Sequence, residues 1–214
     1  MDEKLYYLLI GTFLGWLLGL LSPVISSFIS RSYQKSEIKT GIYNELNEVK
    51  LRMVMVVNVL SPCFTPLCRE HLMWSQPHLE EYDRLYPGSN LAERNKKFLE
   101  LNDDQINTIA AKEISEERER RHHIKAYSLP FLESHTGSLA IFDAEFQRRL
   151  IEIRTQISFL NEEISQSRFY FEKTFDNISL ENYKIIDHNL SESYRNIAKL
   201  LRRLVDNIDK FIDP

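Results

Sequence analysis

The stretch that decides the architecture runs from Leu5 to Ser30, reads LYYLLIGTFLGWLLGLLSPVISSFIS, and contains no charged residue over its 26 positions. A bilayer core about 30 Å thick is crossed by roughly 20 apolar helical residues, so this stretch is long enough to span a membrane. A cleaved signal peptide would have a basic start, a shorter apolar region and a small-residue cleavage site, whereas this chain begins Asp2-Glu3-Lys4. We therefore expect residues 1–30 to form one retained transmembrane helix in a lipid bilayer.

Basic residues on the two sides of this segment predict its orientation. Lys and Arg are retained on the cytoplasmic side of a membrane. The N-terminal flank has Lys4 beside two acids, whereas the other flank is rich in basic residues, namely Arg31, Lys35, Lys39, Lys50 and Arg52. We expect a single-pass protein with its N-terminus outside and residues 31–214 in the cytoplasm.

Three glycines repeat every four residues inside the segment, at Gly11, Gly15 and Gly19. This spacing places them in one stripe on a helix, where another backbone can approach closely. Helix association in lipid depends on such packing, because lipid provides no hydrophobic drive between helices. The stripe predicts an oligomerisation face and a homo-oligomer, although glycine is also common in transmembrane helices for other reasons.

The rest of the composition is that of an ordinary folded protein, with 214 residues, 43% of them hydrophobic and 27% charged. Two cysteines cannot supply the framework of a disulfide-rich secreted domain. A net charge of −4 gives no strong signal for nucleic-acid binding.

Apolar residues after the segment recur at steps of three and four, which is the spacing of an amphipathic helix. They are Ile38, Ile42, Leu46, Val49, Met53, Val56 and Leu60. We expect a membrane-proximal helix over 31–60 that continues the transmembrane helix, with its charged residues, Lys50 included, largely off this stripe. Four prolines between Pro62 and Pro87 then predict short helices and turns over 61–130.

Residues 131–214 contain two long stretches with apolar residues at helical spacing, the first from Leu139 to Phe175 and the second from Tyr183 to Phe211. Turn-forming residues at 176–179 separate them. The pattern predicts an antiparallel helical hairpin, and no stretch of useful length alternates as a strand would. The expected fold is all-α, with one transmembrane helix continuing into a cytoplasmic helical bundle that contains this long C-terminal hairpin.

Four candidate metal ligands fall within sixteen residues, at Cys63, Cys68, His71 and His78. Thiolates and imidazoles suit zinc, and four of them can complete a tetrahedron. Their C-x4-C-x2-H-x6-H spacing matches no standard zinc module, and buried cysteine is also a common core residue. We predict no metal and no cofactor; a Cys63–Cys68 disulfide becomes the leading interpretation if the topology is reversed.

The densest charge run spans residues 116–123 and reads EERERRHH. Acids toward its N-terminal side and bases toward its C-terminal side complement a helix dipole, so a solvated helix end is the favoured interpretation. Arg118 and His123 also have the R-x4-H spacing and in this resemble HEPN-type ribonucleases, an all-helical class. The resemblance implies those two residues as catalytic candidates.

The sequence has no glycine-rich phosphate loop, no G-x-S-x-G and no H-E-x-x-H motif. We therefore expect a membrane-anchored helical protein that acts without catalysis, by self-association and by binding a signal or an unidentified protein partner on the cytoplasmic side. The alternative is an oligomeric membrane-perturbing or pore-forming effector, such as those of bacterial defence systems, and a HEPN-like ribonuclease is the third hypothesis.

Overall fold

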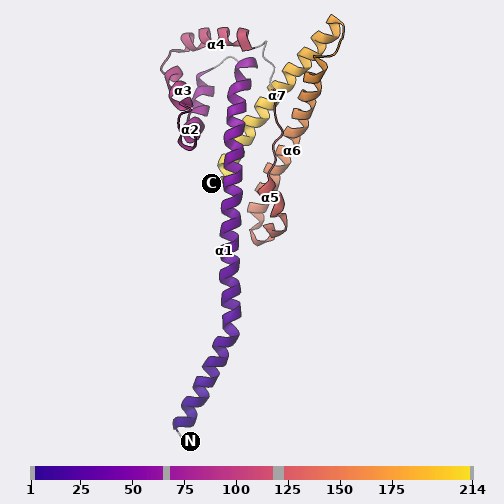
Figure 1. Ribbon diagram of the computed structural model, residues 1–214. Helices are drawn as coiled ribbons and strands as arrows, with labels where there is room; N and C mark the ends of the chain where they lie inside the picture. Colours follow the sequence, from indigo (N-terminus) through magenta and orange to yellow (C-terminus); the bar gives the residue numbers. More distant parts are fainter. Residues whose placement is uncertain (1–2, 65–67, 118–122, 213–214) are drawn as a thin grey trace.

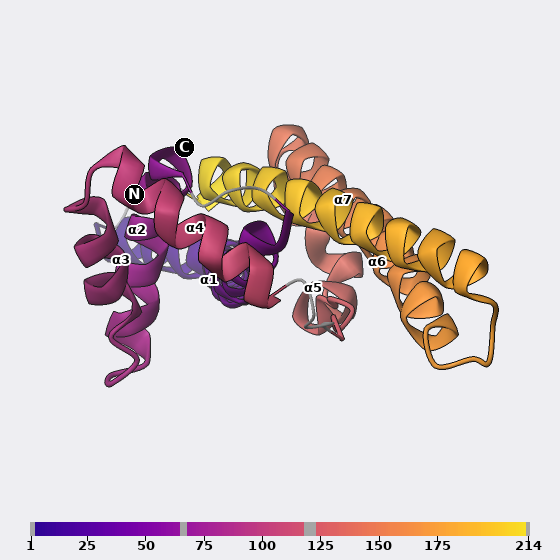
Figure 2. The same ribbon diagram turned by 90° about the horizontal axis from the view of Figure 1, so that it is seen from above.

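A computed structural model of the protein describes residues 3–64, 68–117 and 123–212. All of the regular elements in these ranges are helices, which confirms the predicted all-α class. Figures 1 and 2 place α2, α3 and α4 on one side of the upper part of α1, with α6 and most of α7 on the other side. The C-terminal end of α7 reaches the α2 side.

The first element, α1 (Glu3–Phe64), is 62 residues long and joins the apolar N-terminal segment to the rest of the protein without interruption. At 1.5 Å per residue it extends over about 90 Å. Figure 1 shows that it stands alone in its N-terminal half, where it bends. Among the α1 residues whose burial is described, Ile38 is the first buried one, so the two halves of one helix have different surroundings.

The main core lies where the C-terminal half of α1 meets α6 (Ala144–Lys173) and α7 (Leu180–Ile212). These two long helices run side by side in opposite directions (Figures 1 and 2). Their apolar stripes pack against the α1 stripe because all three carry apolar residues at steps of three and four. The largest fully buried members of this core are Ile42, Leu46, Met53, Leu60, Leu150, Leu160, Ile164, Leu190, Ile197, Leu201 and Leu204.

Three shorter helices, α2 (Arg69–Leu85), α3 (Leu91–Leu99) and α4 (Asp103–Glu117), surround a small second core of Leu72, Ile106 and Ala110. α2 is 17 residues long and contains Pro77 in its interior, whereas the prolines of this stretch were expected to lie at helix ends and in turns. An internal proline removes one backbone hydrogen bond and disfavours a helix. The apolar and polar contacts that α2 makes with α1, α3 and α7 offset that cost.

The segment before α6 also differs from the sequence prediction. Leu139 was expected on the first long helix, but it lies in the 3-10 helix η1 (Thr136–Ile141), which follows the short α5 (Pro130–Ser134). The long helix begins at Ala144 because the Asp143 carboxylate caps it, accepting the backbone N–H of Phe146 at 2.9 Å.

Candidate functional site

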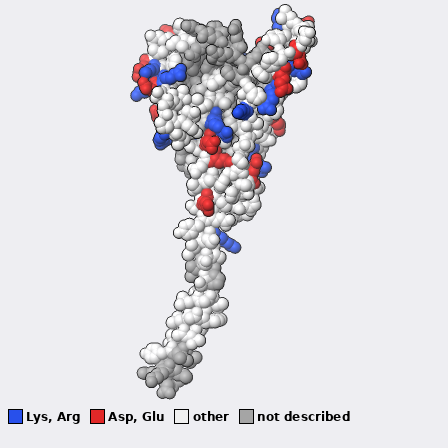
Figure 3. All heavy atoms as spheres, in the orientation of Figure 1, with Lys and Arg blue, Asp and Glu red and all other residues white. Residues whose placement is uncertain are grey.

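The exposed apolar segment of α1 is the first candidate site. It is the one helix, within the described ranges, that is long and apolar enough to cross a membrane, and none of its most apolar window is buried against the protein. Trp16 is 62% exposed and Phe28 is 74% exposed. In Figure 3 this part of the surface shows no Lys, Arg, Asp or Glu until a basic side chain at the junction with the wider part. A core helix would instead be covered by its own chain.

The predicted oligomerisation face lies in this segment. Gly11, Gly15 and Gly19 are all exposed, and a Cβ atom built on any of them would meet no atom within 4 Å. The stripe is therefore open to a neighbour from outside the chain, and the domain's own helices do not use it.

Two contacts attach α1 to α5 just beyond the apolar segment. The Glu45 carboxylate accepts the backbone N–H groups of Phe131 at 2.7 Å and Leu132 at 2.9 Å. These donors lie at the start of α5, where N–H groups lack partners within the helix. One turn earlier, Gly41 faces the Phe131 ring so closely that a Cβ atom there would overlap it. The glycine thus permits the close approach of the two helices.

A buried ionic cluster joins α1, α2 and α7. The Lys50 ammonium lies 3.0 Å from a carboxylate oxygen of Glu81 on α2 and 3.0 Å from one of Asp209 on α7. Burial opposes the charge on Lys50, but the hydrogen bonds to Glu81 and Asp209 outweigh it and raise the lysine pKa above its ordinary value. Asn47 donates to the other Glu81 oxygen at 2.6 Å. Lys50 is only 5% exposed, so its predicted place off the buried stripe was wrong.

Aromatic and polar groups extend this cluster along α2. His78 Nε2 is 3.5 Å from the Asp209 carboxylate. Trp74 Nε1 donates to Asp206 at 2.8 Å, and the Arg202 guanidinium lies over the Trp74 ring at 5.2 Å. Burial lowers the pKa of His78 from its ordinary value, although Asp209 acts in the opposite direction. The arrangement ties α2 to α7 through several charge-assisted contacts.

His71, the other histidine of the candidate metal set, contacts a residue of α1. It is buried, and its Nε2 is 3.0 Å from Asn58 Oδ1. Burial, with the nearby positive charge of Arg202, lowers its pKa to about 4, so the ring is neutral at pH 7. A neutral ring can donate its Nε2 proton to the Asn58 oxygen.

The four candidate zinc ligands are only partly placed. Cys68 has a free thiol immediately before α2, and the side chain of Cys63 lies outside the described residues. His71 and His78 are buried toward Asn58 and Asp209. Among the described side chains no group of three or more His, Cys, Asp or Glu has the arrangement of a metal site. The four-ligand site therefore remains a hypothesis from spacing.

The candidate catalytic pair is also incompletely placed, because Arg118 lies outside the described residues. His123 is exposed, and its ring centroid is 6.3 Å from that of Phe171 on α6. α4 ends at Glu117, so the acidic part of the charge run lies at a helix end.

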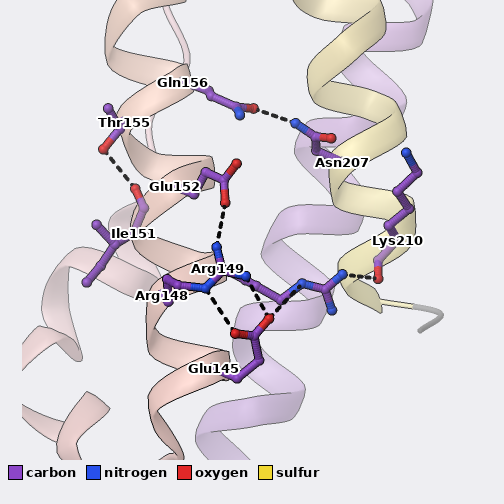
Figure 4. A network of polar contacts seen from close by, with 9 residues as sticks. All are labelled: Glu145, Arg148, Arg149, Ile151, Glu152, Thr155, Gln156, Asn207 and Lys210. Atoms are coloured by element: carbon purple, nitrogen blue, oxygen red, sulfur yellow. Dashed lines mark hydrogen bonds and ion pairs between the residues drawn. The ribbon is translucent and has the colours of Figure 1, made fainter.

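Figure 4 shows the polar network that ties the start of α6 to the end of α7. The Arg149 side chain donates to the backbone carbonyl of Lys210 at 3.1 Å, in the last turn of α7. Arg148 donates two hydrogen bonds to Glu145, at 2.8 and 2.9 Å. The two arginines are matched by the carboxylates of Glu145 and Glu152, so the network is better suited to holding the two helices together than to binding an anion.

A comparison of the chain with protein-family models, curated proteins and solved structures finds no match. The fold and the side-chain geometry above are therefore the basis of the functional argument.

Proposed function

We propose that the protein is a single-pass membrane protein whose helical bundle lies at the cytoplasmic face, and that it acts by self-association and by binding a signal or partner, without catalysis. The observation that carries the proposal is the continuity of α1. One helix supplies both the exposed apolar segment and a buried stripe of the main core. A movement of the core is therefore transmitted to the apolar segment with no linker to absorb it.

The lipid bilayer is the partner that fits the exposed part of α1. Large apolar side chains cover this part outside the glycine stripe, and their exposure is costly in water and favourable in lipid. The Lys35 ammonium lies 5.6 Å from the centre of the Phe142 ring, so the bundle begins about five residues beyond Ser30. In the proposed topology its α5 end lies beside the headgroup layer, and Arg31 and Lys35 lie on the cytoplasmic side, where basic residues are retained.

Self-association through Gly11, Gly15 and Gly19 is supported by their shared spacing and by the open space above each of them. The decisive variant is Gly15→Ile, which adds a branched side chain in the middle of the stripe. Leu17→Ile is the matched control, because two residues along a helix lie about 200° around its axis.

The test is the mass of full-length protein in zwitterionic nanodiscs or mild detergent, measured by light scattering. We expect wild type and Leu17→Ile to form the same oligomer and Gly15→Ile to shift toward the monomer. An unchanged mass for Gly15→Ile would contradict the glycine interface.

Membrane attachment is tested separately by carbonate extraction. We expect the wild-type chain to stay with the lipid fraction at high pH. Recovery of the unprocessed chain in the soluble fraction would refute the anchor.

A second measurement separates the two kinds of assembly. Depolarisation of the membrane on expression would favour the pore-forming effector over a non-conducting assembly.

A further inference from the structure

A pocket of about 360 Å³ lies between α1 and the irregular segment that leads to α5. Its floor consists of α1 residues between Arg52 and Leu60, and its wall consists of residues 123–127. Figure 1 shows the chain passing alongside α6 on its way to α5. Pockets of about 300–1,000 Å³ are typical of small-molecule sites.

The wall of the pocket is held in place by α6. Asn161 donates to the Tyr127 carbonyl at 2.7 Å and accepts the Tyr127 N–H at 2.9 Å, so one side chain fixes both backbone groups. Ile124 and Leu129 are buried on either side of this contact. The segment is thus fixed on both sides, and the pocket is formed before any ligand arrives.

The surface inside the pocket is largely apolar, with Met55, Val56 and Val59 on the α1 side. Aliphatic side chains of this kind favour an apolar ligand body, because burial of its surface removes it from water. Arg52, at the near end of the pocket, is 22 residues beyond Ser30, the end of the apolar segment. At 1.5 Å per residue this separation is about 33 Å along α1, so a ligand reaches the pocket from the aqueous side.

Two positive charges, Arg52 and Lys125, lie at the same place. Both line the pocket together with His123, and all three residues are exposed. Within the described part of the chain, no carboxylate forms an ion pair with Arg52 or Lys125. An anionic group placed between these side chains would receive charge-assisted hydrogen bonds.

A buried hydroxyl adds a further donor. Tyr127 is 93% buried and lines the pocket, and no described residue forms a hydrogen bond with its hydroxyl. Burial raises its pKa to about 12, against the effect of the Arg52 charge, so it keeps its proton at pH 7. A buried hydroxyl group favours a hydrogen-bond partner, and an oxygen atom of a ligand in this pocket would accept the Tyr127 proton.

We propose that this pocket binds a small organic anion with an apolar body, whose anionic group lies between Arg52, Lys125 and the Tyr127 hydroxyl. The apolar body rests on Met55 and Val59. A carboxylate and a phosphate ester share this chemistry. Binding does not depend on the membrane anchor or on self-association, so it goes beyond the proposed function and supplies a candidate signal for it.

The test uses full-length protein in phosphatidylcholine nanodiscs, with 2-naphthyl phosphate as the probe and isothermal titration as the measurement. Empty nanodiscs provide the blank, and 2-naphthoate compares a carboxylate with the phosphate ester. We expect saturable binding of a naphthyl anion at one site per chain, and binding of inorganic phosphate at least tenfold weaker, because it lacks the apolar body.

Two variants address the two halves of the site. Arg52→Gln removes one charged donor and is expected to weaken binding about tenfold, since a hydrogen bond to a charged group contributes roughly that factor. Ala126→Trp fills the pocket from its exposed wall and is expected to abolish binding. The controls are Arg154→Gln, at an exposed position of α6, and Ala140→Trp, at an exposed position of η1. We expect both to bind as wild type does.

Circular dichroism establishes that each variant is folded, and Lys125→Gln replaces Arg52→Gln if that variant is not. The proposal is overturned if neither naphthyl anion gives saturable heat above empty nanodiscs, or if Ala126→Trp binds as tightly as wild type. Equal affinity for inorganic phosphate would also overturn it, because the apolar body would then contribute nothing.

Discussion

Replacing Lys50 with methionine tests how much the buried ionic cluster contributes to stability. The lysine ammonium contacts Glu81 and Asp209, each at 3.0 Å, and its side chain is 6% exposed. Removing one member of a buried ion pair costs about 3–5 kcal/mol, because a buried charge loses its partner. Methionine keeps the apolar contacts of the lysine stem, so the lost charge dominates the effect.

Two features place the cost of Lys50→Met at or below the lower limit of that range. Glu81 keeps its hydrogen bond from Asn47, and the Asp209 side chain is 35% exposed and also faces His78. We expect a loss of about 2–3 kcal/mol in the free energy of unfolding, or roughly 1 M in the urea midpoint for a chain of this size.

The assay is urea unfolding of full-length protein in nanodiscs, followed by circular dichroism. Lys199→Met, at an exposed position of α7, is the control and should leave the midpoint unchanged. In Lys50→Met/Glu81→Leu, part of the lost stability should return, because one unpaired carboxylate is gone. The reasoning is refuted if Lys50→Met unfolds within 0.2 M, on the order of experimental error, of Lys199→Met.

Two further predictions use the same unfolding assay. Glu45→Gln leaves one oxygen to accept the two N–H groups at the start of α5, so it should lower the free energy of unfolding by about 1–2 kcal/mol. The control Glu48→Gln, at an exposed position, should leave the urea midpoint unchanged. Equal midpoints for the two variants would contradict the cap. For His71, the unfolded ring binds a proton near pH 6.5 and the folded ring only near pH 4, so this contribution to stability is present at pH 7 and decreases as the pH falls between those values. Between pH 7 and pH 5, we expect the free energy of unfolding of His71→Gln to fall by about 2 kcal/mol less than that of wild type. The control His188→Gln, at an exposed position, should behave as wild type does. The same pH dependence in all three proteins would refute this assignment.

Helical periodicity in the sequence is sufficient to predict the all-α fold. The α1 stripe from Ile38 to Leu60 is buried at nearly every position, because steps of three and four keep one face toward α6 and α7. The apolar run before it is also evident in the sequence, because it is uncharged and long enough to cross a bilayer.

The polar contacts could not be predicted in the same way. Lys50 lies four residues after Leu46 and three before Met53, so the spacing alone could have predicted its position on the buried face. Its partners Glu81 and Asp209 could not be predicted, because they come from remote parts of the chain. Pro77 in the middle of α2 reverses the local preference, since tertiary packing outweighs it. The pocket depends on Asn161 holding the Tyr127 backbone, a contact that no local pattern contains.

The unbroken course of α1 also fixes an angular relation between its two ends. Gly11, Gly15 and Gly19 precede Ile38, Ile42 and Leu46 by 27 positions each. At about 100° per residue this separation amounts to seven and a half turns, so the glycines point about 180° away from the core residues. Two copies joined back to back at their glycines would hold their domains on the outer sides of the pair, free of collision. A one-residue insertion near Gln34 would rotate each domain by about 100° about the α1 axis relative to the glycines. An insertion of seven residues makes nearly two full turns, so it would almost restore the original orientation.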